Sequence, residues 1–211
     1  MRRKAERSMK KQNLGGRRPA VLMAAAALLA GVLFTAGGCG TGPSEEEIRQ
    51  TVQALVEAAE PINEIFYGEG VPVKDYEIEE ADGLSSTVDF QYVSVSEDAP
   101  YQSIEQIKEA AEQVFTEAYL AGVYESAFVR TEDLYPRYAE DAQGRLTRNV
   151  KQSFKSTDEW TEWDFSTLTV VKSTERLVEV RLEGTFAGRT ETETLRLEKE
   201  ADGWRLASPT Y

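Results

Sequence analysis

The sequence contains no histidine and only one cysteine among its 211 residues. Without histidine the chain cannot form a Ser-His-Asp triad, use a histidine as acid or base, or hold zinc or haem through imidazole. With one cysteine it cannot form an intrachain disulfide, a CxxC redox pair or a cysteine-rich metal site. We therefore expect a protein that is not an enzyme and that needs no cofactor and no metal.

Acidic residues outnumber basic residues by 37 to 24, which gives a net charge of −13. The excess is uneven, because residues 1–38 hold eight bases and one acid, and residues 39–211 hold the remaining 16 bases and 36 acids, a net of −20. Such an acidic body is a poor partner for nucleic acid, whose phosphates require basic side chains. A basic protein or a cation is the expected counterpart, although solubility alone explains the same charge.

The N-terminal segment has three parts in a characteristic order. Residues 1–18 are basic and polar, residues 20–36 form an uncharged and mostly apolar run, and Gly37 and Gly38 precede Cys39. A charged region, an apolar region and a small-residue cleavage site together predict an export signal. With 17 residues, the apolar run is at the short limit for a bilayer-spanning helix.

The string Ala36-Gly37-Gly38-Cys39 resembles the lipobox of bacterial lipoproteins, with Ala36 where that family usually has leucine. In that family the cysteine is diacylated and becomes the first residue after cleavage. The resemblance implies a signal peptide over 1–38, a lipidated Cys39 with a short tether over 39–43, and a domain on the outer face of the cell membrane. Buried acyl methylenes would anchor it at ~0.8 kcal/mol each. An uncleaved anchor helix, or secretion with a free thiol, remains an alternative.

Two helices are predicted in the remaining chain. Ser44 and Glu47 form a capping-box pattern, and an apolar stripe follows until Pro61 is expected to kink or end the helix. Gly68 and Gly70 should end this unit. Residues 103–122 predict a second helix with Gly122 at its C-terminal cap, and residues 123–130 predict a further turn or two.

The other segments alternate apolar and polar residues, as strands do. Residues 71–100 are predicted as extended chain with a turn at Asp82-Gly83, and residues 134–150 as a hairpin around Gln143-Gly144. Four further strands are predicted at 165–172, 177–186, 191–200 and 204–208. In the second of them the apolar face comprises Val178, Val180, Leu182 and Phe186. This order predicts a single α+β domain over 44–211, with N-terminal helices packed on a curved, cone-like antiparallel sheet.

The order of elements resembles the cone-shaped NTF2-like and cystatin-like folds. Residues 163–165, 169–171, 195–200 and 202–211, with 101–104 and 115–120, are similar to stretches of many Gram-positive lipoproteins. The nearest group is the IseA-type DL-endopeptidase inhibitors, which bind and block peptidoglycan-cleaving cysteine peptidases. The resemblance implies a non-catalytic regulatory module whose partner is a basic cell-wall hydrolase. It transfers no individual inhibitory residue to this chain.

Four aromatic residues are candidates for a binding surface. Trp160 and Trp163 stand close to Phe165 and predict either an aromatic platform for a peptide or glycan, or core filling. Tyr135 and Tyr138 predict either the lining of a groove or packing beneath the hairpin. A second hypothesis is a small-molecule binder or enzyme that uses the cone's interior, with a buried carboxylate such as Asp89 as its base. A passive envelope component is a third.

Overall fold

The computed structural model describes residues 42–77, 91–131, 135–152 and 160–211. The signal segment over 1–38, Cys39, the expected turn at Asp82-Gly83 and Asp89 lie outside the described residues. The elements in chain order are α1 (Glu45–Tyr67), β1 (Tyr92–Ser94), α2 (Ile104–Glu112), α3 (Glu117–Phe128), β2 (Tyr138–Glu140), β3 (Leu146–Asn149), β4 (Glu162–Ser173), β5 (Leu177–Phe186), β6 (Arg189–Glu200) and β7 (Gly203–Leu206).

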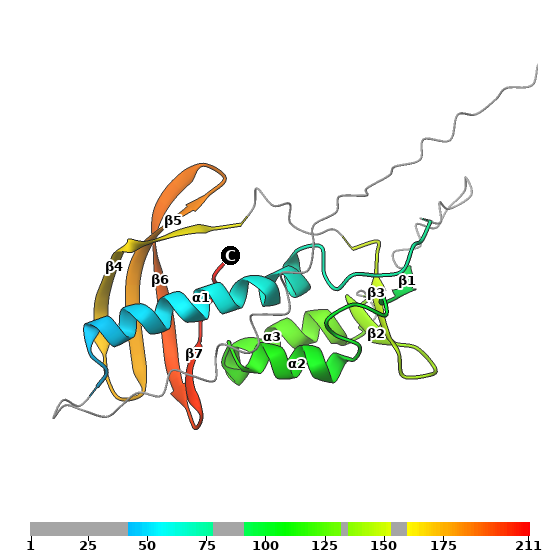
Figure 1. The fold of residues 1–211 in the computed structure, drawn as a ribbon, viewed down its shortest axis with the longest axis horizontal. Coiled ribbons are helices and arrows are strands. Elements are labelled where there is room, and N and C mark those ends of the chain that lie inside the picture. Colours follow the sequence, from blue (N-terminus) through cyan, green and yellow to red (C-terminus); the bar gives the residue numbers. More distant parts are fainter. Residues whose placement is uncertain (1–41, 78–90, 132–134, 153–159) are drawn as a thin grey trace, which may run out of the picture.

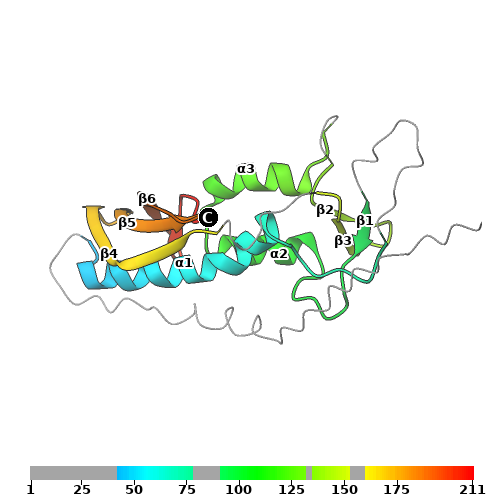
Figure 2. The ribbon, with the colours of Figure 1, turned by 90° about the horizontal axis from the view of Figure 1, so that it is seen from above.

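The architecture is α+β, as predicted, with its strands in two antiparallel sheets (Figure 1). One sheet has the order β1-β3-β2 and the other the order β4-β5-β6-β7. The two sheets lie at opposite ends of an elongated molecule, with α2 and α3 between them and α1 running along the four-stranded sheet (Figures 1 and 2). Within the described residues, no helix is both long enough and apolar enough to cross a membrane.

Helix α1 begins at the predicted capping box and buries an apolar stripe. The Ser44 hydroxyl accepts a hydrogen bond from the Glu47 backbone N–H at 3.3 Å, and the Glu47 carboxylate accepts one from the Ser44 N–H at 2.8 Å. The sequence predicts that Pro61 kinks or ends the helix. The helix does not end there, because α1 continues to Tyr67. Buried side chains follow Pro61 at helical spacing, and their packing outweighs the lost backbone hydrogen bond. Gly68 ends the helix as expected.

Two arginines from distant parts of the chain cap the C-terminal ends of α1 and α2, neither of which has a basic residue in its last turn. Arg137 is 5% exposed and donates from Nε to the Ile65 carbonyl at 2.9 Å and from Nη2 to the Gly68 carbonyl. Arg205 in β7 donates from Nε to the Glu112 carbonyl at 2.7 Å. Each guanidinium satisfies free carbonyls and complements the negative end of the helix.

The single helix predicted over 103–122 is wrong, because the structure divides it into α2 and α3. Between them the backbone turns to pair with β7, where Thr116 N–H donates to the Leu206 carbonyl at 2.9 Å and Leu206 N–H donates to the Val114 carbonyl at 2.8 Å. Thr116 then caps α3. Gly122, expected as a helix end, lies inside α3. Pairing with the sheet therefore overrides a continuous apolar stripe.

The four-stranded sheet is the predicted meander, and α1 crosses its inner face (Figure 2). We call the α1-facing side the inner face; on β5 it carries Val178, Val180 and Leu182, all buried, and the outer face carries charged residues. The void between α1 and the sheet beside Val178 and Trp204 is too small for a water molecule. Phe186 has the inner-face parity but is 44% exposed, which departs from the prediction. It lies at the hairpin end of β5, beyond the cover of α1.

Candidate functional site

The inner face of the sheet changes its chemistry towards the β5–β6 hairpin. On β6, alternate residues point to the inner face. Leu197 and Leu195 are buried there, and towards the hairpin the next inner-face positions hold exposed Glu193, Glu191 and Arg189. On β5 the paired positions are Leu182, Gly184 and Phe186. The same face that buries the core thus continues, beyond α1, as an exposed surface with two carboxylates and an aromatic ring.

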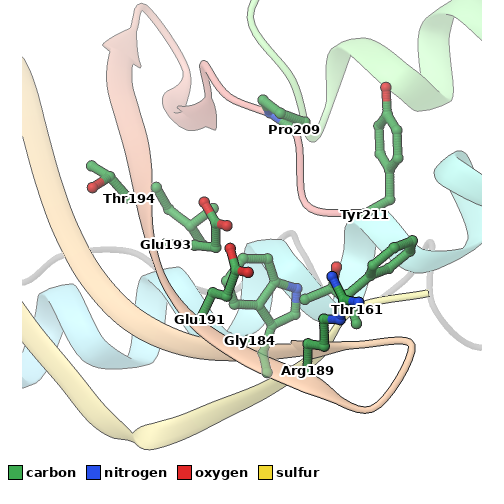
Figure 3. Close-up of a pocket in the computed structure, with 11 residues that line it drawn as sticks. Thr161, Gly184, Arg189, Glu191, Glu193, Thr194, Pro209 and Tyr211 are labelled. Atoms are coloured by element: carbon green, nitrogen blue, oxygen red, sulfur yellow. The ribbon is translucent and has the colours of Figure 1, made fainter. Parts of the chain in front are cut away.

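A pocket of about 370 Å³ lies on this exposed part of the inner face (Figure 3). Its sheet side includes Trp163 from β4, Gly184 and Phe186 from β5, and Glu191 and Glu193 from β6. The segment 209–211 forms another wall through Pro209 and Tyr211. Arg189 stands at the hairpin end. The pocket therefore combines aromatic surface with both signs of charge.

Gly184 lets the Trp163 indole lie against β5. The two residues are directly paired across the strands, and a Cβ atom at position 184 would lie 3.2 Å from Trp163 Cζ3 and 2.7 Å from Thr161 Cγ2. Any other residue would push the indole and the threonine away. The glycine thereby positions the aromatic part of the pocket.

The segment 209–211 is held in place by hydrogen bonds from two distant elements. Trp163 Nε1 donates to the Thr210 carbonyl at 3.0 Å, and Asn63 Nδ2 of α1 donates to the Thr210 hydroxyl at 2.8 Å. The Tyr211 ring lies 4.0 Å from that of Tyr67, measured between ring centroids. This pocket wall is therefore fixed by α1 and β4.

Replacing Thr210 with valine should destabilise the protein by about 1–3 kcal/mol, because it leaves the buried Asn63 amide without this acceptor. Urea denaturation followed by circular dichroism measures the loss, and the indole N–H resonance of Trp163 reports any shift of the pocket wall. Thr210→Ser keeps the hydroxyl and is the matched control. If serine and valine cost the same, the hydrogen bond does not hold the wall.

Two tyrosines beneath the 209–211 segment are poor acid–base groups. Burial raises the pKa of both Tyr67 and Tyr119, so that their hydroxyls stay protonated across the physiological range. The two glutamates of the pocket are exposed to water. No cluster of three metal-ligating side chains occurs in the described ranges. The arrangement offers charge attraction and aromatic contact, which suit binding.

The structure separates the four aromatic residues that the sequence singled out. Trp163 lines the pocket, and Trp160 meets the Tyr211 ring edge-on at 6.4 Å between centroids. Tyr135 lies towards the three-stranded sheet, with the Arg130 guanidinium 4.7 Å from its ring centroid. Trp163 therefore belongs to the candidate site, Trp160 contacts its wall through Tyr211 without lining the pocket, and Tyr135 lies elsewhere.

Tyr138 is corrected from a candidate surface residue to a core residue, because it is fully buried. Its hydroxyl donates to the Ile65 carbonyl at 2.8 Å and accepts from the Val71 N–H at 3.0 Å. It therefore fixes the end of α1, as the packing alternative for this residue anticipated.

The pocket residues that sequence reasoning missed include Phe186, Glu191, Glu193 and Tyr211. A signal for the glutamates was present, because they continue the parity of Leu195 and Leu197 on a strand with one covered face. A charged residue at an inner-face position indicates where α1 stops covering the sheet. No comparable signal existed for Tyr211, whose place depends on contacts with α1.

No protein-family model matches the sequence, and no curated protein matches it significantly.

Proposed function

We propose that this chain is an exported, membrane-anchored binding module that engages a basic protein of the cell envelope at the pocket of the four-stranded sheet. The supporting observation is the uncovered continuation of the inner face, where Phe186, Trp163 and two exposed glutamates meet. Exposed aromatic side chains beside a hollow are typical anchors of protein interfaces. The net charge of −20 over residues 39–211 attracts a basic partner.

The specific form of this proposal is inhibition of a peptidoglycan DL-endopeptidase. It rests on the resemblance of residues 71–211 to the IseA-type inhibitors and on the opposite charges of this domain and a basic hydrolase. The module would cover the hydrolase cleft without performing any chemistry. Anchoring through Cys39 would place it on the outer face of the membrane, beside the cell wall.

Replacing Phe186 with alanine should weaken inhibition of a purified basic DL-endopeptidase about tenfold or more, as loss of an aromatic interface anchor does. The assay titrates the full-length protein in detergent against the hydrolase at low and at high salt. Val171→Ala is the control, since Val171 lies on β4 outside the pocket and is similarly exposed, at 50% against 44%.

The outcomes separate the parts of the proposal. Lack of inhibition at either salt concentration would overturn the hydrolase version. Equal inhibition by the Phe186 variant and the wild type would remove the pocket from the interface. Inhibition that is unchanged by salt would contradict only the role of long-range attraction.

A further inference from the structure

We propose that the pocket receives a single cationic side chain, lysine or arginine, from the partner. This inference rests on the proposed binding function and names the chemical group that the site recognises. It is carried by the position of two carboxylates, which form no ion pair with any residue that the structure describes, beside an aromatic wall.

The pocket lining carries an excess of negative charge from Glu191 and Glu193. No ion pair to Glu191 or Glu193 occurs within the described residues. On the outer face of the same strand, by contrast, Glu198 pairs with Arg196 at 2.7 Å. Arg189 also lines the pocket, so one arginine and two glutamates give a net lining charge of −1. This balance matches one incoming cation and disfavours an anion.

The aromatic wall adds a second attraction for a cation. Trp163 lies against Gly184 in the pocket lining, and Phe186 lies in the same lining. A lysine or arginine group over an indole face gains cation–π attraction and buries its aliphatic stem on the ring. The protein already uses this contact, since Lys199 Nζ lies 5.8 Å from the Trp204 ring centroid and Lys108 Nζ lies 5.0 Å from that of Tyr124.

The size of the pocket suits a side chain. A volume of about 370 Å³ is near the lower end of the usual range for ligand sites. Figure 3 shows Glu191 and Glu193 side by side on β6, with Pro209 and Tyr211 on the segment beyond them. A long basic side chain can enter between these walls with its charged end at the glutamates, while the partner's backbone stays outside.

The test uses the full-length protein in detergent and the probe N-acetyl-lysine methylamide, with the Trp163 indole N–H resonance as reporter. N-acetyl-norleucine methylamide is the matched probe, because it keeps the aliphatic chain and lacks the ammonium group. We expect the lysine probe to bind saturably and about tenfold more tightly than norleucine. Equal binding of the two probes, or no binding of lysine, overturns the inference.

Glu191→Gln combined with Glu193→Gln should weaken lysine binding about tenfold at 0.15 M salt, where the Debye length is about 8 Å. Glu183→Gln combined with Glu200→Gln is the matched control, since it removes the same charge from the outer face of the sheet. Its lysine affinity should stay near that of the wild type. Equal losses in the two double variants would mean that overall charge, and not the pocket, attracts the probe.

Arg189→Gln gives an independent check, because it removes the competing cation while leaving both glutamates in place. Lysine binding should tighten about threefold. Weaker binding would contradict the inference. If the lysine probe does not bind but the protein still inhibits the hydrolase, this inference alone is overturned. If the lysine probe binds but the hydrolase is not inhibited, the hydrolase version alone is overturned.

Discussion

Replacing Phe115 with alanine should lower the free energy of unfolding by about 3–5 kcal/mol, the usual cost of a buried phenylalanine truncation. Phe115 is 2% exposed, and its ring stacks on Tyr119 with 4.8 Å between centroids. Its backbone forms a bridge with Leu206 of β7, so it stands where α2, α3 and the four-stranded sheet meet. For a domain whose total stability is about 5–15 kcal/mol, this loss is a large fraction.

The measurement is urea denaturation followed by circular dichroism, with Phe186→Ala as the matched control. Both variants lose the same ring, but Phe186 is 44% exposed, and we expect a cost of about 1 kcal/mol or less there. Similar losses at both positions would contradict the view that Phe115 joins the helices to the sheet.

Local sequence patterns predicted most of the four-stranded sheet and the start of each early helix. The alternation of Val178, Val180 and Leu182 with charged residues reflects one covered face, and the structure buries those three side chains. Ser44 and Ser103 cap α1 and α2 through hydrogen bonds to residues three positions ahead. The sequence predicts such features because the interacting residues lie within a few positions of each other in the chain.

The wrong predictions arose where distant contacts decided the outcome. The stripe from Ile104 to Ala118 is compatible with one helix, yet hydrogen bonds between the 114–116 backbone and Leu206 break it. Helix α1 passes Pro61 because its buried stripe continues beyond that residue. The end of α1 depends on Arg137, which lies about seventy positions away, at separations of 72 and 69 residues from its two acceptors. Helical propensity alone contains none of this information.

The candidate site was predictable only in part. Trp163 stood out as an aromatic residue near others, but its neighbour Gly184 depends on the register of β4 and β5, which includes irregularities. The wall at Thr210 depends on Asn63, 147 residues earlier in the chain. The sequence therefore identified both tryptophans as candidates for binding. The pocket that Trp163 lines could be recognised only from the tertiary structure.

Replacing Cys39 with serine should abolish nearly all membrane association of the mature domain, or stall its processing at the precursor. The reason is that serine cannot carry the thioether-linked lipid that the lipobox-like string predicts, and each buried methylene of that lipid contributes ~0.8 kcal/mol to anchoring. Two acyl chains hold a protein on a membrane, whereas an acidic domain without them has no attraction to an anionic surface.

The measurement is membrane fractionation with mass spectrometry of the product. The wild type should pellet with membranes and have the mass of a diacylated chain beginning at Cys39, and Thr41→Ser should behave identically as the matched control. A wild-type protein that keeps residues 1–38 would instead support an uncleaved anchor helix formed by the apolar run over 20–36. Unchanged fractionation and unchanged processing of the Cys39 variant would contradict lipidation, and with it the placement of the binding pocket beside the cell wall by this route.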